Sequence, residues 1–576
     1  MTIGRRKFIG CTGAFPIVGM ALTAWADEKP LLRIGVMTDT HVGETKASCR
    51  RVKLACELFR RHDVDMVVNV GDVADYHYPK GYAAYRAVVD KAFEEMPVRP
   101  KELFVYAAHD TFAYKGCKKR SEWPKHIDEA FADMQRLIGA ENGPYAEGTI
   151  KGIPYVVFPQ SMTGGLDLAC VEKMIARAVA ANPGKPVVVF AHVPPAGTTR
   201  TGRGDARKTA LFSKYPQIVN ISGHTHGSLA DERAIWQGAF TSVNAGCLQN
   251  WGDGRDGIVG NSVKRMNNYG AMVIDVFASR IAFRRFDVRD GSEYHAEMPW
   301  IVPWPFDPAT APYRHAARMA ASSVPSFAEN AELKAAPSDG PDGGVSLTIP
   351  VTSAGPRPYA YRVRMERLEA AGSWALHARR DFFGDFWQTA GERPREYRLD
   401  FAPAYFDAGA QYRFRVTPVN CWGREGRSLC VPAPAIEPGN TGVMVWKSDD
   451  PMRECRFVSG GKNVPCEGGF FLMGAADAKL LMPEGVWRGP KGAKFRFTVD
   501  IRAVQAQSPA WTIVLRNEKP MVNAHGRIST PGGDLGTLRY VVDFGKRADD
   551  HAYVLLVREG GKGKIRFERI SVERLG

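Results

Sequence analysis

The sequence predicts an α/β domain, with a largely parallel sheet covered by helices, followed by two all-β sandwich domains. Short apolar runs suited to buried strands recur along the first half of the chain, and amphipathic segments of helical length separate them. After residue 323 this alternation gives way to short strands broken by turns. At 576 residues the chain is too long for one hydrophobic core, so several domains are expected.

The first domain is expected to contain five buried strands, each followed at once by a block of Asp and His residues. The predicted strands are 32–37, 66–70, 103–106, 187–190 and 218–221. The blocks read Asp39-Thr-His41, Gly71-Asp72-Val-Ala-Asp75, Ala108-His109-Asp110, Ala191-His192 and Gly223-His224-Thr-His226-Gly227. Ligands of parallel α/β sheets bind beyond the carboxyl ends of the strands, where all five blocks fall.

Two blocks place candidate ligands at alternate positions, Asp39 with His41 and His224 with His226. Alternation in a strand or tight loop sets both side chains on one side, as chelation requires. A single histidine such as His109 or His192 would more often be a structural residue. The combination of blocks therefore predicts a site for a divalent metal held by carboxylates and imidazoles.

Together the five blocks resemble the signature of the calcineurin-like metallophosphoesterases, over roughly residues 31–290. That signature reads D-x-H, G-D-x-x-D, G-N-H-[DE], a single histidine before a loop, and G-H-x-H; four blocks fit it as they stand. The resemblance implies hydrolysis of phosphomonoesters or phosphodiesters by a metal-activated hydroxide. It also implies one or two divalent metal ions, which can be Mn, Fe or Zn.

The resemblance further implies a role for each candidate residue. The expected metal ligands are Asp39, His41 and His226 for the first ion, His192 and His224 for the second, and Asp72 for both. His109 is expected to act on the leaving group, with Asp110 orienting it. Asp75 is expected to support the ligands rather than to bind metal.

The third block departs from the signature, because the family's Gly-Asn is Ala107-Ala108 here. In the family this asparagine lends an oxygen to the second metal, and a methyl group has no lone pair to offer. We therefore expect a weakened second site. The competing hypothesis is that Tyr76, His77 or another nearby group replaces the asparagine.

Residues 1–26 have the composition of a removable signal peptide. A basic start with Arg5-Arg6-Lys7 precedes an apolar stretch and an Ala24-Trp25-Ala26 cleavage site. The paired arginines followed by Phe8 resemble a twin-arginine signal, and an ordinary secretory signal is the alternative. We expect a periplasmic or extracellular protein with no transmembrane segment in the mature chain.

The formal net charge is +15, of which the signal contributes three positive charges, leaving +12. A basic exported protein favours anionic partners such as a phosphoester substrate. Basic residues concentrate after two of the predicted strands, where they either attract substrate or are simply solvated: Lys115, Lys118, Lys119, Arg120, Lys125, Arg200, Arg203, Arg207 and Lys208.

Three segments follow the domain predicted over 31–290. Residues 291–323 are rich in Pro and Trp and are expected to pack back on that domain. Residues 324–438 resemble a fibronectin type III sandwich, chiefly through the stretch Tyr412–Asn420. Residues 440–576 resemble a jelly-roll or galactose-binding sandwich. In these segments Cys421 with Cys430, and Cys455 with Cys466, are candidate disulfides or else free core thiols.

Two other functions remain open. A non-catalytic or weakly catalytic protein with a degenerate site would bind a glycan or cell-surface ligand through its C-terminal sandwiches. A nuclease would use the basic loops to hold nucleic acid. Retention of all six expected metal ligands argues against a degenerate site.

Overall fold

The computed structural model describes residues 28–575 apart from several short segments. Those outside the description are 44–45, 76–78, 113, 115–125, 161–165, 200–203, 250–268, 297–298, 340–342, 389–392, 437–441, 460–461, 464–465, 468–469, 473–477, 484, 505–511, 518–523, 530–535, 547–552 and 559–563. The predicted signal peptide therefore lies outside the described residues. No helix within the described ranges is long and apolar enough to cross a membrane.

The first sheet has the strand order β12-β11-β10-β1-β2-β3, with β13 also paired to β11. Its parallel strands are β1 (Leu32–Met37), β2 (Met66–Asn69) and β3 (Lys101–Phe104). Its antiparallel strands are β10 (Gly270–Val276), β11 (Arg280–Asp287), β12 (Ser292–Glu293) and β13 (Trp300–Pro303).

The second sheet has the order β4-β5-β6-β7-β9-β8. Its strands are β4 (Ala146–Ile150), β5 (Ile153–Val157), β6 (Val187–Phe190), β7 (Ile218–Ser222), β8 (Ile235–Gln237) and β9 (Thr241–Asn244). Strands β5, β6, β7 and β9 run parallel, whereas β4 and β8 are antiparallel at the two edges.

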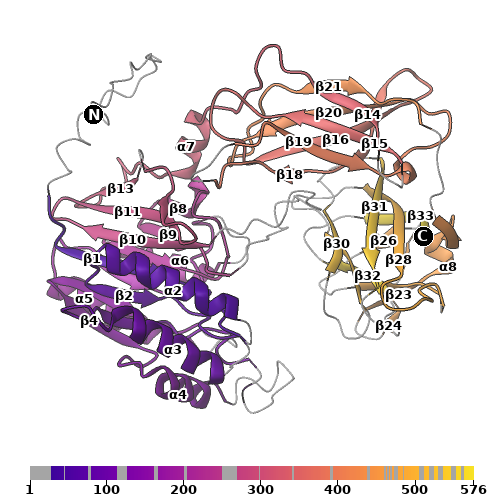
Figure 1. Ribbon diagram of the computed structural model, residues 1–576. Helices are drawn as coiled ribbons and strands as arrows, with labels where there is room; N and C mark the ends of the chain where they lie inside the picture. The colour runs from indigo at the N-terminus through magenta and orange to yellow at the C-terminus, as the bar shows by residue number, and fades with distance from the viewer. Residues whose placement is uncertain are drawn as a thin grey trace.

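The two sheets pack face to face, and helices cover their outer faces (Figure 1). Alternate residues of β1 serve different layers: Ile34 and Val36 join the apolar cluster between the sheets, and Met37 joins the cluster under the helices. The covering helices are α2 (Lys46–Arg61), α3 (Pro79–Phe93) and α4 (Ile127–Ile138) on the first sheet, and α5 (Leu168–Ala181) and α6 (Ala206–Phe212) on the second. The predicted α/β class, with sheets covered by helices, is confirmed, and each of the two sheets contains both parallel and antiparallel strands.

The segment after β12 packs back on the first domain, through β13 and the short helix α7 (His315–Ala321). Nε1 of Trp300 donates to the carboxylate of Glu232 (2.9 Å), and a guanidinium N–H of Arg318 donates to the same carboxylate. Arg285, a buried residue of β11, donates to its other oxygen (2.8 Å). Glu232, in the 3-10 helix Glu232–Ala234, is thus the common acceptor that ties this segment to the rest of the first domain.

The second domain is a pair of antiparallel sheets. One has the order β14-β15-β19, the other β17-β16-β20-β21 with β18 on β16. Its strands are β14 (Lys334–Pro337), β15 (Val345–Pro350), β16 (Ala360–Leu368), β17 (Trp374–Arg379), β18 (Phe382–Phe383), β19 (Glu396–Phe401), β20 (Tyr412–Val419) and β21 (Leu429–Pro432). Tyr361, Leu399 and Phe414 meet in the core between the sheets.

The third domain also consists of two sheets, ordered β25-β26-β33-β28-β31 with β22 on β33, and β24-β23-β27-β32-β29-β30. The first contains β22 (Gly442–Ser448), β25 (Cys466–Glu467), β26 (Phe470–Leu472), β28 (Lys494–Val504), β31 (Thr537–Gly545) and β33 (Lys564–Leu575). The second contains β23 (Arg456–Ser459), β24 (Lys462–Asn463), β27 (Ala478–Leu481), β29 (Thr512–Asn517), β30 (Ala524–Ser529) and β32 (Tyr553–Arg558). A one-turn helix, α8 (Pro451–Glu454), precedes β23.

Both C-terminal domains are therefore all-β sandwiches, as the sequence predicts, and their assignment to the fibronectin or jelly-roll type stays a prediction. Of the two alternatives for Cys421 and Cys430, the structure has the free thiols. Cys430 lies opposite Arg415 in the β20–β21 pair, whereas Cys421 follows the end of β20. The strand register thus holds the two residues apart. Cys455 is also a free thiol, and the side chain of Cys466 lies outside the description.

Candidate metal centre

The structure brings the six predicted metal ligands together where the carboxyl ends of the two sheets meet. Asp39 and His41 follow β1, and Asp72 follows β2, all in the first sheet. His192 follows β6 and the His224/His226 pair follows β7, both in the second sheet. The site therefore depends on the face-to-face packing of the sheets, because neither sheet supplies a complete set of ligands.

The backbone at this site is strained. All the predicted ligands except His192 have a positive φ, between 41° and 68°: Asp39, His41, Asp72, His224 and His226. Few residues other than glycine adopt this conformation, and they cluster at functional sites. The positive φ turns each loop sharply at the end of its strand. The strain is an observation independent of the side-chain chemistry, and it marks the same residues.

Three groups of side chains present ligand atoms within 4.8 Å of one another. The groups are Asp39, His41 and His226; then His41, Asp72 and His109; and then Asp72, His192 and His224. Nε2 of His226 is 3.0 Å from Asp39 Oδ1, and Nε2 of His192 is 3.1 Å from Asp72 Oδ2. The first and third groups match the two sets of ligands expected from the sequence, and the second group connects them.

The orientation of His192 fits a metal ligand. Its Nδ1 donates to the carbonyl oxygen of Val70 (2.8 Å), and a carbonyl can only accept, so the proton is on Nδ1. Nε2 then carries the lone pair that a metal requires. This Nε2 and Asp39 Oδ1 are among the buried atoms of the described residues that have no hydrogen-bond partner. Buried polar atoms without partners are costly, and a bound cation would satisfy both.

The electrostatics also fit a cation. Burial would raise the pKa of Asp72, but the charge of His192, whose Nε2 lies 3.1 Å from Asp72 Oδ2, holds this pKa well below its usual range. Burial would lower the pKa of His192, but Asp72 and Asp39 raise it to about 9. The carboxylates thus remain ionised and require positive charge. Carboxylate oxygens and imidazole nitrogens are a suitable donor set for Mn, Fe or Zn, whose binding would displace protons.

His109 contacts Asp75, not the carboxylate that the sequence analysis assigned to it. Asp75 Oδ1 is 2.8 Å from Nδ1 of His109. The Asp110 carboxylate instead accepts hydrogen bonds from the backbone N–H groups of Val73, Ala74 and Ala107. We therefore correct the expected role of Asp110: it shapes the loop that carries Asp72, and Asp75 orients the imidazole.

Gln160 is a residue of the site that the sequence reasoning missed. Its side-chain oxygen accepts a hydrogen bond from the backbone N–H of Ala108 (3.1 Å). Its backbone N–H donates to the carbonyl oxygen of Tyr106 (2.8 Å). It follows β5, a strand without a motif block at its end. The available signal was its position as the first amide side chain after that buried apolar strand.

The basic residues predicted to surround the site divide into two groups. Those numbered 115–125 and 200–203 lie outside the described residues. Arg207 pairs with Asp205 (2.9 Å). Lys208 is 2 % exposed, and its ammonium donates to the carbonyl oxygen of Val193 (2.8 Å), next to His192. These two residues are therefore engaged within the protein, and Lys208 supports the His192 loop instead of attracting substrate from solvent.

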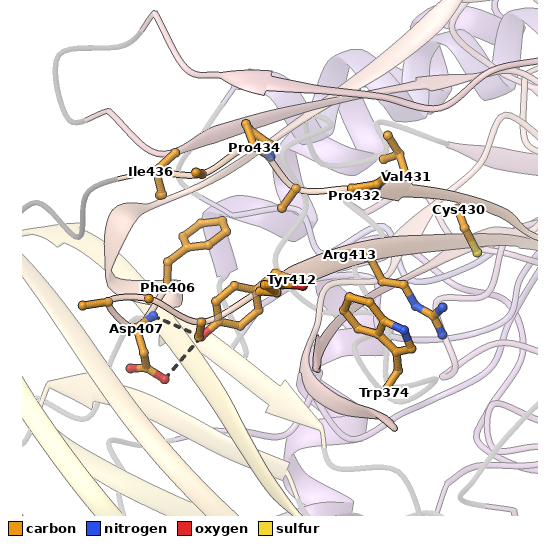
Figure 2. A pocket seen from close by; sticks show the side chains of 16 residues that line it. Trp374, Phe406, Asp407, Tyr412, Arg413, Cys430, Val431, Pro432, Pro434 and Ile436 are labelled. Carbon is orange, nitrogen blue, oxygen red and sulfur yellow. Dashed lines mark hydrogen bonds between the residues drawn. The ribbon is translucent and has the colours of Figure 1, made fainter. Parts of the chain in front are cut away.

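A separate cavity of about 800 Å³ lies in the second domain, between the β20–β21 strands and the loop before β20. Figure 2 shows Trp374 and Arg413 at one end and Phe406 with Tyr412 at the other. The Arg413 guanidinium carbon lies 4.5 Å from the centre of the Trp374 ring. The hydroxyl of Tyr412 donates to Asp407 (3.3 Å), so the wall combines aromatic and charged groups.

The calcineurin-like phosphoesterase family model matches residues 32–228, from β1 to just beyond the last ligand loop. This confirms the predicted resemblance for the first domain. Similar solved structures include a dimetal phosphatase from Danio rerio (10% identity, TM-score 0.32, covering 48% of this chain and 100% of that one). Others are a purple acid phosphatase from yellow lupin (14%, 0.33, 46% and 52%) and the phosphoesterase Yfce from E. coli (14%, 0.22, 46% and 96%). No curated protein matches the chain.

Proposed function

We propose that this chain, whose first domain is a calcineurin-like phosphoesterase domain, is an exported metal-dependent hydrolase of phosphomonoesters or phosphodiesters. The observation that carries the proposal is the overlap of the three ligand groups. The first and second groups share His41, and the second and third share Asp72. Such a cluster fits two adjacent cations with Asp72 shared between them. Divalent metals bound there would neutralise phosphate oxygens and activate a water molecule.

His109 would then have two roles, one through its backbone N–H and one through its imidazole. The backbone N–H of His109 donates to Asp72 Oδ1 (3.0 Å), which fixes the shared carboxylate. Burial would lower the pKa of His109, but Asp75 and Asp72 raise it above its usual value. This shift favours the protonated imidazole, which can donate its proton to the leaving oxygen.

The proposal is tested by the turnover of p-nitrophenyl phosphate and bis-p-nitrophenyl phosphate with added Mn²⁺, Fe²⁺ or Zn²⁺. We expect metal-dependent turnover that Asp72→Asn abolishes. Asp90→Asn is the matched control, since Asp90 is an exposed residue of α3 paired with Arg99. Metal binding without turnover of either ester would favour the non-catalytic alternative. Salt-sensitive binding to DNA would favour a nuclease.

Export is part of the proposal and rests on residues 1–26 alone. A fusion of this segment to a reporter that folds in the cytoplasm should be exported, and Arg5→Lys with Arg6→Lys should block it. Export that survives this double substitution would identify an ordinary secretory signal.

For the second domain we propose a glycan ligand in the cavity of Figure 2. Aromatic surface beside charged hydrogen-bonding groups suits the apolar faces and hydroxyls of a sugar. Glycan-array binding by the full chain should be lost in Trp374→Ala and kept in Trp446→Ala, a control in the third domain. An array on which the native chain binds nothing would refute this role.

A further inference from the structure

Three successive backbone N–H groups at the end of β3 are each bound by a different side chain. Ala107 N–H donates to Asp110 (3.3 Å), Ala108 N–H to Gln160 (3.1 Å), and His109 N–H to Asp72 (3.0 Å). Adjacent N–H groups of a tight turn form a concave surface that collects oxygen atoms. The amide oxygen of Gln160 and the carboxylate that both metals are expected to share thus accept from neighbouring N–H groups of the same turn.

Gln160 is fixed in this place by the meeting of the two sheets. Its backbone N–H donates to Tyr106 O, while Phe158 N–H, two residues earlier, donates to Phe190 O (3.4 Å). The chain after β5 is thus attached to the extension of β3 and to the last residue of β6. Tyr106 leads to His109 and Phe190 leads to His192, so Gln160 lies between two of the loops that build the site.

Ala108 offers no ligand atom at the position of the family's asparagine. Ala108 carries only a methyl group and is 5 % exposed. The third ligand group, Asp72 with His192 and His224, provides one carboxylate and two imidazoles. An uncharged oxygen would add a ligand without further reducing the positive charge available to an anionic substrate.

We infer that Gln160 supplies the uncharged amide oxygen of the second metal site, in place of the side chain that Ala108 lacks. The carbonyl oxygen of an amide has two lone pairs, so it can accept from Ala108 N–H and still bind a cation. The inference deepens the proposed function, on which its significance rests. It predicts that the second site binds its metal with ordinary affinity. It thus favours the hypothesis that a nearby group replaces the family's asparagine over the expectation of a weakened second site.

The test measures metal binding without substrate. Full-length chain stripped of metal is titrated with Mn²⁺, the bound metal is counted by mass spectrometry, and Co²⁺ absorption reports the coordination number. We expect two ions in the native chain. Gln160→Ala should weaken the second ion by about 10- to 100-fold, with the first unchanged. Gln135→Ala is the matched control. It removes the same amide side chain from α4, a helix that carries none of the expected ligands.

A rescue separates a ligand from a residue that only positions the loop. Ala108→Asn in the Gln160→Ala background restores an amide oxygen but not the acceptor for the Ala108 N–H. Recovery of the second ion and of the Co²⁺ spectrum supports the inference. Native second-ion affinity in Gln160→Ala, or no recovery in the double variant, overturns it. Since no step uses a phosphoester, an inactive chain that shows this pattern would refute the proposed function and leave the inference standing.

Discussion

The carboxylate of Asp75 lies 2.8 Å from Nδ1 of His109. The same oxygen is 3.3 Å from Nδ1 of His41. The other ring nitrogen of His41, Nε2, lies beside His226 of the first ligand group. One side chain therefore orients both a proposed metal ligand and the proposed proton donor. The pKa of Asp75 is lowered by these two imidazoles despite burial, so the carboxylate stays charged.

Asp75→Asn should shift the pH dependence of the reaction. Without the negative charge of Asp75, the pKa of His109 falls, and its proton is lost at lower pH. We expect the basic limb of the kcat/KM profile to move to lower pH, and kcat to fall by about 10- to 100-fold. Asp90→Asn serves as the charge-matched control. A profile that changes only in height would show that Asp75 does not set the protonation of His109.

His109→Ala should remove a proton donor without removing a metal ligand. We expect kcat to fall by about 10²- to 10⁴-fold, and bound metal to stay at the native level. Esters with good leaving groups should suffer less, because their oxygen needs little protonation. Metal analysis and a series of substituted phenyl phosphates measure both effects. Loss of metal in this variant would instead assign His109 to the second ligand group that contains it.

Whether the first domain folds without the two C-terminal domains should depend on the residue at which the chain is shortened. A chain ending at Met298 lacks β13, whose pairing with β11 extends the first sheet, and it lacks Trp300 on Glu232. We expect it to aggregate. A chain ending at Ser323 keeps both and should bind metal and turn over small esters.

Its Tm should nevertheless be lower than that of the full chain, because Tyr359 and Phe383 of the second domain pack against the core of the first. The Arg233 guanidinium also lies over the Tyr359 ring, 4.7 Å from its centre. Thermal melting and turnover of the two shortened chains check this. A folded, metal-loaded chain ending at Ser323 that turns over nothing would show that later domains complete the active site.

Glu232 should make stability depend on pH. Burial would raise its pKa, but Arg285 and Arg318 lower it to about 2. A carboxyl whose folded pKa lies below its unfolded value stabilises the fold above the unfolded pKa. The contribution is therefore complete above about pH 4.5 and is lost as the pH falls toward 2. Glu232→Gln should lower the Tm at pH 7 and flatten its acid dependence; Glu94→Gln, at an exposed carboxylate paired with Lys91, is the control.

Strand positions were predictable where both faces of a strand are buried. β1 and β6 begin and end as predicted, since apolar residues fill both layers. β3 starts earlier than expected, at Lys101, because it is the last strand of its sheet and an edge tolerates polar residues. The division into two mixed sheets was not predictable from strands that were read singly.

The residues that gather at the site were predictable from the strand ends, because a strand's carboxyl end fixes where the next residue lies. The contacts among them were not. Asp75 rather than Asp110 meets His109, and Gln160 meets Ala108, because sharp turns and the junction of two sheets set these distances. Such contacts join residues far apart in the sequence and carry no local pattern.

The left-handed backbone of the site has a consequence for how this chain can change over time. At five of its six proposed ligands, an Asp or His occupies a conformation that glycine would adopt without cost, and each such position holds about 1 kcal/mol or more of strain. A descendant that abandoned the metal would gain stability by replacing them. Loss of function would therefore leave a recognisable trace, with glycines or asparagines accumulating at those positions before the surrounding strands change.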